Sequence, residues 1–303
     1  MDLKQTLKKS FQSIWIILKL IIPIYIIADI LFYYNTLSYI SFLVEPITTA
    51  IGLPPEASLS IISGMFLNVY GAIAFAAPLD LTIHQWTILA VFVGICHSLV
   101  VESVIMKKIG LTNTYSYILR ISSGFVVAFI TALLPSSWFS ATITTTDTFK
   151  VQEYSSLTDL LYNSFLNSIE LSITVIILIT ALIFIMDFIK TRKFIKESKK
   201  NVSKGFSLTV GIILGITYGA GILINEVENG NIKDEDIFYI GTFLMICHAV
   251  IEDTLLFVIF GADFTMAVVI RTISAIIISY FLLLIYRKYR KNKPFSKYIH
   301  PSH

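Results

Sequence analysis

The hydrophobic positions of the chain gather into long apolar runs that are separated by short polar or basic stretches. An α-helix needs about 20 apolar residues to cross the roughly 30 Å of hydrocarbon in a bilayer. Several runs approach this length, and a shorter stretch at 37–53, interrupted by Pro46 and Gly52, predicts an interfacial helix. The predicted membrane segments are 14–34, 57–80, 84–107, 114–138, 160–189, 205–227, 237–260 and 264–286.

The polar and glycine positions inside these runs occur twice. The tetrapeptide Ile-Cys-His-Ser at 95–98 returns as Ile-Cys-His-Ala at 246–249, an offset of 151 residues. A repeat of half the length in an apolar chain is typical of transporters whose site lies between two halves. The matched positions are Tyr70 with Tyr218, Gly71 with Gly219, Glu102 with Asp253, Gly110 with Gly261, Thr114 with Thr265, Arg120 with Arg271 and Ser123 with Ser274.

The composition agrees with a membrane protein. Hydrophobic residues make up 55% of the 303 residues, charged residues make up 14%, and the mean hydropathy is +0.78. Soluble domains carry roughly 25% charged residues, so we expect the lipid bilayer to surround most of this chain. The net charge of +3 arises at the predicted membrane edges, and we expect no nucleic-acid partner. The two cysteines lie inside predicted helices, which favours reduced thiols over a disulfide.

Lysine and arginine placement predicts the topology, because cytoplasmic loops carry an excess of these residues. The N-terminus, the stretch 190–204 and the tail 287–297 are basic, and we expect all three to be cytoplasmic. The stretches 35–56 and 136–149 contain neither lysine nor arginine and are expected to be external. The N-terminal apolar run is too long for the core of a signal peptide, which indicates a retained helix.

Eight full crossings cannot satisfy these assignments, so one element in each half must enter and leave on the same side. The best candidates are 57–80 and 205–227, because both are rich in glycine, which weakens a helix. Broken backbone at membrane depth persists only where it lines a protein cavity. The alternative is eight ordinary spanning helices with a weak charge bias.

The fold class that follows is an all-α membrane protein built from two inverted-topology repeats. Each repeat has three transmembrane helices and one glycine-rich re-entrant hairpin. The predicted division is repeat 1 at 1–135, an external linker at 136–159, and repeat 2 at 160–303, which ends in a basic cytoplasmic tail.

Charged residues inside the predicted helices identify candidate ion pairs. Glu102 and Arg120 flank the turn at Gly110, and Asp253 and Arg271 occupy the matching positions of the second half. At 1.5 Å per residue, these side chains start roughly 12–15 Å from the turn, close to the bilayer midplane. An isolated charge there costs on the order of 3 kcal/mol, so we expect each acid to face its arginine. Such pairs can serve only to hold the helices together, or can also belong to a functional site.

The strongest candidate site surrounds the repeated histidines, His97 and His248. In a helix, His248 and Glu252 share one face, and Glu252 has no acidic counterpart in the first half. Cys247, His248 and Glu252 are therefore candidate ligands of a divalent metal, or the carboxylate and the histidine can relay protons. The alternative is that histidine and cysteine only fill the core. The full predicted substrate or coupling site is His97, Glu102, His248, Glu252 and Asp253, with backbone groups from Tyr70, Gly71, Tyr218 and Gly219.

Other chemistries have no support in the sequence. The chain contains no Gly-Lys dipeptide, which excludes a Walker-type nucleotide-binding loop. We find no serine or cysteine nucleophile motif and expect the protein not to be an enzyme.

The duplicated unit resembles the nucleoside-recognition or Gate-domain membrane proteins. The resemblance rests on the Tyr-Gly-Ala stretch, on the hairpin that carries Cys-His, an acid, a glycine and an arginine, and on the glycine-then-proline segment 71–79. That group includes spore-maturation-type membrane proteins and the membrane part of the bacterial ferrous-iron transporter B. The resemblance covers most of both repeats and implies membrane transport.

Taken together, the patterns predict a secondary transporter or permease of the cell membrane, with both termini cytoplasmic and its site at the midplane between the halves. The expected cargo is a small polar solute or a divalent cation. Two alternatives stay open: a nucleoside-type solute transporter, and a non-transporting membrane assembly protein of the spore-maturation type. A homo-oligomer is compatible with either.

Overall fold

The computed structural model describes residues 3–34, 36, 41–141, 154–191, 212, 224 and 232–290. All the regular structure in this part of the chain is helical, and six segments are long and apolar enough to cross a membrane. The all-helical membrane class predicted from the sequence is therefore confirmed. The six segments are 10–33, 83–107, 113–132, 157–185, 234–258 and 264–289.

Two of the six segments are not single helices. The first consists of α5 (Ile83–Cys96) and α6 (Leu99–Lys107), and the second of α12 (Asp234–Ile246) and α13 (Val250–Val258). These breaks differ from the expectation of continuous helices at 84–107 and 237–260. The other four segments are the unbroken helices α1 (Leu3–Tyr33), α7 (Asn113–Ala132), α8 (Leu157–Thr191) and α14 (Phe264–Arg290).

The glycine-rich segment 57–80 forms two short helices, α3 (Ala57–Phe66) and α4 (Val69–Ala76). Each has ten residues or fewer, about half of what a membrane crossing needs. The two helices pack together, and Ser60 Oγ donates a hydrogen bond of 2.7 Å to Ala72 O. Asn68 is extended between them, and its side chain caps α4 by accepting a 3.0 Å hydrogen bond from Gly71 N. The matching segment 205–227 lies outside the described residues, except for 212 and 224.

The remaining short elements lie near the predicted external stretches. A helix, α2 (Ser41–Ala50), forms within the stretch 37–53. A 3₁₀ turn at Ser136–Trp138 follows α7, which ends earlier than the predicted 138. The start of the linker contacts the start of α14, because Ser140 N donates a 2.9 Å hydrogen bond to Asp263 Oδ2.

The two broken helices run antiparallel to each other in the centre of the molecule. Near the start of α5, Trp86 stacks on Phe260 at 5.1 Å between ring centroids, just beyond the end of α13. At the opposite end, the Leu111 side chain, which follows α6, lies against Gly241 of α12. Tyr115 at the start of α7 also contacts α12, with 2.8 Å between its hydroxyl and Thr242 Oγ1.

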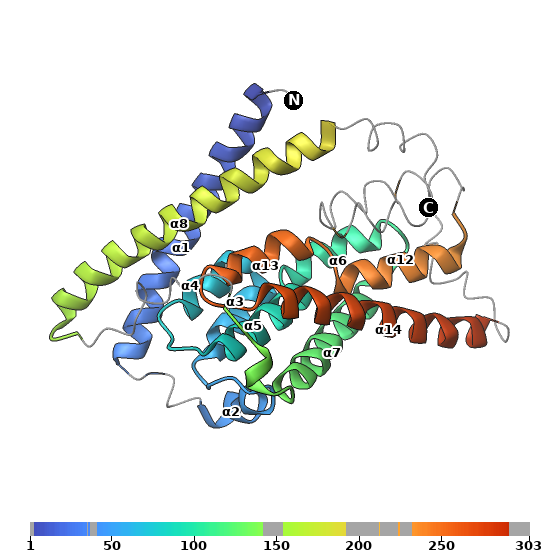
Figure 1. The fold of residues 1–303 in the computed structure, drawn as a ribbon, viewed down its shortest axis with the longest axis horizontal. Helices are drawn as coiled ribbons and strands as arrows, with labels where there is room; N and C mark the ends of the chain where they lie inside the picture. The colour runs from blue at the N-terminus through green and yellow to red at the C-terminus, as the bar shows by residue number, and fades with distance from the viewer. Residues whose placement is uncertain are drawn as a thin grey trace.

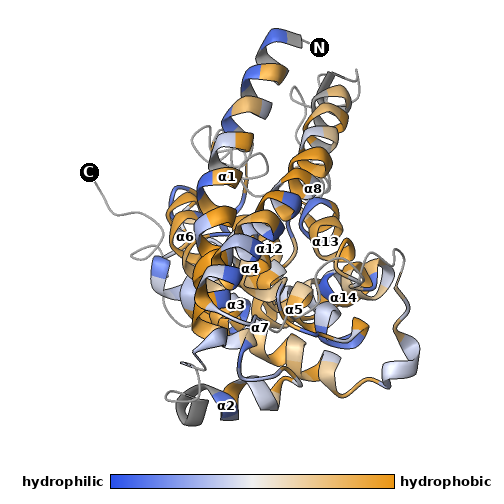
Figure 2. Cartoon of the chain, turned by 90° about the vertical axis from the view of Figure 1, so that its left-hand side faces the viewer, coloured by the Kyte–Doolittle hydropathy of each residue, from blue (hydrophilic) through white to orange (hydrophobic). Residues whose placement is uncertain are grey.

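The helices α1 and α8 cross each other at one side of this centre, and α7 and α14 lie beside the broken helices (Figure 1). Figure 2 shows hydrophobic residues along most of α8. The outer face of α14 is also apolar, as expected for a helix that faces lipid. Its exposed side chains include Ile273, Ile276, Ile277 and Phe281.

Candidate functional site

The breaks in the two central helices occur at equivalent positions of the repeat. Ser98 precedes α6 with φ of +47°, and Ala249 precedes α13 with φ of +44°. These are the only non-glycine residues with positive φ in the described part of the chain. The left-handed conformation costs an L-residue on the order of 1 kcal/mol, so it persists only where the surroundings enforce it. Each break leaves helix carbonyls without their usual partners.

Two fully buried arginines satisfy these carbonyls. Arg120 of α7 donates from Nε to Ile95 O at 2.7 Å and from Nη2 to His97 O at 2.6 Å. Arg271 of α14 donates from Nη2 to His248 O at 3.0 Å and also to Gly94 O at 2.6 Å. A cation is favoured at a helix C-terminus because free carbonyls give it partial negative charge. Arg271 therefore caps the broken helices of both halves.

The acids that follow the breaks pair with these arginines. Glu102 and Asp253 occupy the first turns of α6 and α13, where the helix dipole favours negative charge. Arg120 Nη2 lies 2.8 Å from Glu102 Oε2, and Arg271 Nη2 lies 3.6 Å from Asp253 Oδ2. Both ion pairs predicted from the repeat are present, and the first is the closer.

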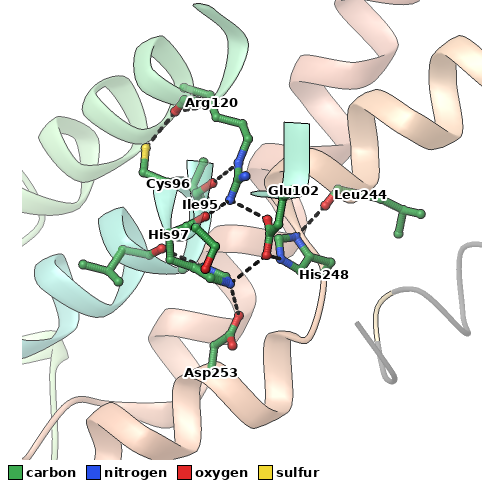
Figure 3. A network of polar contacts seen from close by, with 12 residues as sticks. Ile95, Cys96, His97, Glu102, Arg120, Leu244, His248 and Asp253 are labelled. Carbon is green, nitrogen blue, oxygen red and sulfur yellow. Dashed lines mark hydrogen bonds and ion pairs between the residues drawn. The ribbon is translucent and has the colours of Figure 1, made fainter. Parts of the chain in front are cut away.

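Glu102 also contacts the histidines of both halves, His97 and His248 (Figure 3). Its Oε1 atom lies 3.1 Å from His97 Nε2 and 3.1 Å from His248 Nε2. The other ring nitrogen of each histidine contacts a backbone carbonyl: His97 Nδ1 lies 3.0 Å from Val93 O, and His248 Nδ1 lies 2.7 Å from Leu244 O. A carbonyl oxygen can only accept, so each Nδ1 carries a proton and each Nε2 points toward Glu102.

The geometry corrects the predicted metal-ligand set of Cys247, His248 and Glu252. That set assumed a continuous helix, but α12 ends at Ile246 and α13 begins at Val250, so helical spacing does not apply between His248 and Glu252. Cys247 Sγ instead lies 3.7 Å from Thr272 Oγ1. Among the described residues, the group with ligand spacing is His97, His248 and Asp253, whose donor atoms all lie within 4.8 Å of one another.

Both cysteines are buried free thiols, and each makes a hydrogen bond to a neighbouring helix. Cys96 Sγ donates a 3.0 Å hydrogen bond to Arg120 O, where the absence of a side chain at Gly124 leaves room for the sulfur. In each Cys-His dipeptide, the histidine therefore faces the cluster and the cysteine faces a neighbouring helix. That helix is α7 for Cys96 and α14 for Cys247.

Some of the remaining predicted site residues lie on the described helices, and others lie outside the described residues. Glu252 is half-buried on α13, next to Asp253. Tyr70 lies on α4, and the α3–α4 pair reaches the first break through Ser98, whose N and Oγ donate hydrogen bonds of 3.0 Å to Gly64 O and Leu67 O. Gly71 is held through its backbone N–H by Asn68. Tyr218 and Gly219 lie outside the described residues.

A further buried carboxylate, outside the cluster, belongs to the contact between α1 and α8. Asp29 accepts hydrogen bonds from the hydroxyls of Ser164 and Tyr154, the latter at 2.8 Å. Burial raises the pKa of the Tyr154 phenol to about 12, and the bond to Asp29 acts in the same direction, so Tyr154 stays a neutral donor. This contact accounts for a charged residue that the sequence places inside the first membrane helix.

Comparison with known proteins places the chain beside one named relative. The uncharacterized membrane protein YvoD of Bacillus subtilis (strain 168) is 27% identical over 298 residues, which cover 94% of this chain and 95% of that protein. No family model matches the chain, and no solved structure matches it. The full-length similarity and the six apolar segments support an integral membrane protein.

Proposed function

We propose that this protein is a secondary transporter or permease whose site is the buried cluster at the two helix breaks. The observation that carries the proposal is the contact of Glu102 Oε1 with His97 Nε2 and His248 Nε2, each at 3.1 Å. Titratable groups inside a membrane protein are costly and usually mark a path for ions, protons or substrate. Here they come from both halves and meet where two helices are interrupted, as in transporters built from repeats.

The proposal includes two inverted repeats of three crossings and one re-entrant hairpin. Two observations support this arrangement. The equivalent broken helices run in opposite directions, as the contact of Trp86 with Phe260 and that of Leu111 with Gly241 require. The paired helices α3 and α4 are each too short to cross, which suits a hairpin that enters and leaves on one side. The basic residues near both termini support cytoplasmic termini in this arrangement.

The proposed cargo is a small polar solute or a divalent cation. The cluster offers imidazole nitrogens, carboxylate oxygens and guanidinium donors within a small buried space, so it can bind either class. The resemblance to Gate-domain proteins also makes a nucleoside a candidate solute.

A second candidate function is that of a membrane assembly protein without transport. It is favoured by the arginines, because both cap backbone carbonyls and would be needed for the fold alone. In that case the ion pairs only hold the broken helices together. The shared contact of Glu102 with two histidines is not needed for that purpose.

Uptake into liposomes that contain the purified protein tests the proposal. Vesicles would be offered nucleosides, small polar metabolites and divalent cations in turn, with and without a pH gradient. We expect accumulation of one class, and loss of that uptake in Glu102→Gln and in Glu252→Gln. Asp80→Asn is the matched control, because Asp80 is an exposed carboxylate outside the cluster.

Folding of each variant would be checked by its elution from a size-exclusion column and by its thermal unfolding in detergent. Wild-type protein that folds but accumulates none of these solutes would favour the assembly role. Uptake by folded Glu102→Gln at the wild-type rate would remove the cluster from the transport path.

A further inference from the structure

The ring nitrogens and carboxylate oxygens of the cluster converge as the ligands of a cation do. Each Nδ1 donates to a backbone carbonyl, so in a neutral imidazole each Nε2 presents a lone pair. Each lone pair then faces Glu102 Oε1 at 3.1 Å and repels it, whereas a protonated Nε2 would donate a hydrogen bond to it. A cation placed between them turns the repulsion into coordination.

The histidines also have the surroundings of metal ligands. A histidine that binds a metal usually donates its other ring N–H to a carbonyl or carboxylate, which fixes the ring and its tautomer. Val93 O and Leu244 O hold His97 and His248 in this way, and both carbonyls belong to helices that end at the breaks. The two Nε2 atoms are therefore oriented before any ion arrives.

Asp253 is the carboxylate best placed to complete the set. Its Oδ2 atom lies 4.0 Å from His97 Nε2 and accepts no hydrogen bond among the described residues, although it is buried. Its contact with Arg271, at 3.6 Å, is the longest of the three that Arg271 Nη2 makes. Asp253 can therefore turn toward an ion while Arg271 keeps both carbonyls.

We propose that His97, His248 and Asp253 bind a divalent first-row transition-metal ion, with Glu102 Oε1 within reach as a fourth ligand. Imidazole and carboxylate together favour such ions over Ca²⁺ and Mg²⁺, which prefer all-oxygen sites. Bonds of about 2.1 Å separate tetrahedral ligands by roughly 3.4 Å, so binding would draw His97 and Asp253 together slightly. This places ligands from both halves on one ion.

The role of that ion as cargo rests on the proposed function, whereas its binding does not. The test therefore measures binding on full-length protein in detergent, without an affinity tag. Zn²⁺, Co²⁺, Mn²⁺ and Mg²⁺ would each be titrated by equilibrium dialysis with elemental analysis. We expect one Zn²⁺ or Co²⁺ per chain and no saturable binding of Mg²⁺. Wild-type protein that binds no transition metal would overturn the proposal and leave protons as the positive charge.

Variants then locate the site. Loss of an orienting partner alone weakens metal binding by about 10- to 100-fold, so we expect at least that loss in His97→Gln, His248→Gln and Asp253→Asn. His84→Gln is the matched control, because His84 lies on α5 but bonds to Thr131 O instead of the cluster. A double variant that replaces His300 and His303 removes the remaining histidines of the chain and should bind metal as the wild type does.

The spectrum of bound Co²⁺ also distinguishes this site from one in which the Cys247 thiol is a metal ligand. With imidazole and carboxylate ligands, bound Co²⁺ should show visible ligand-field bands without a sulfur-to-cobalt charge-transfer band. Cys247→Ser should then leave the spectrum and the affinity unchanged. A charge-transfer band that disappears in Cys247→Ser would show that the thiol is a ligand and would refute the assignment. Metal binding without uptake in liposomes would sustain the site and reject the transport role.

Discussion

Removing the negative charge of Glu102 should destabilise the protein strongly through Arg120. Glu102→Gln keeps the shape of the side chain but leaves a fully buried guanidinium without its counter-ion, which lies 2.8 Å away in the wild type. Breaking one side of a buried ion pair costs about 3–5 kcal/mol. The cost can be measured as the change in free energy of unfolding when SDS is titrated into mixed micelles.

The double variant Glu102→Gln with Arg120→Met separates pairing from capping. Arg120 also satisfies Ile95 O and His97 O, and each carbonyl left without a partner costs about 1–3 kcal/mol. Arg120→Met alone is therefore destabilising, and it also leaves the buried Glu102 carboxylate without its arginine. In the double variant the charge penalty disappears and the carbonyl penalty remains, so the coupling energy should be about 3 kcal/mol or more.

The same cycle on Asp253 and Arg271 is the internal comparison. Their closest contact is 3.6 Å, against 2.8 Å for the first pair, so we expect a smaller coupling energy. Losses that add to within about 0.5 kcal/mol in the Glu102 and Arg120 cycle would show that the two residues do not act as partners.

Three further predictions concern the breaks and the topology. Ala249→Val should unfold more easily than Ala249→Gly by at least about 1 kcal/mol, because the backbone at this residue is left-handed; equal stabilities would contradict that conformation. Gly94→Ala would place a methyl carbon 2.6 Å from Arg271 Cζ, and such overpacking should cost about 1–3 kcal/mol in thermal unfolding. Cysteines introduced at Ser137 and Ser198 should react with an impermeant thiol reagent from opposite sides of the membrane, and reaction from the same side would reject the inverted arrangement.

The sequence predicted the membrane class and the ion pairs because both depend on simple regularities. Apolar length identifies a spanning segment, and a charge near the midplane needs a partner. The spacing around Gly110 was enough to pair Glu102 with Arg120, and the repeat carried the argument to the second half.

The breaks at Ser98 and Ala249 had no comparable signal. Neither residue is glycine or proline, and both lie inside apolar runs that look continuous. Glycine content pointed to 57–80, where a break between α3 and α4 is present, but it gave no reason to interrupt 84–107. What stabilises the breaks is remote: arginines on α7 and α14 supply the donors that the helices lose.

The partner of His248 could not be read from local spacing either. Helical periodicity favoured Glu252, four residues away, whereas the contact found is with Glu102, 146 residues away. The antiparallel packing of the two broken helices brings these residues together. A repeat shows which residues are equivalent, but only the packing of the broken helices shows which of them meet.

The centre of the molecule is not symmetric, although the chain is built from a repeat. Glu102 contacts both histidines at 3.1 Å and Arg120 at 2.8 Å. Asp253 lies farther from its neighbours, at 4.0 Å from His97 and 3.6 Å from Arg271. Asp253 therefore has room to change its partner without breaking a short contact, whereas any movement of Glu102 would break three contacts of 3.1 Å or less.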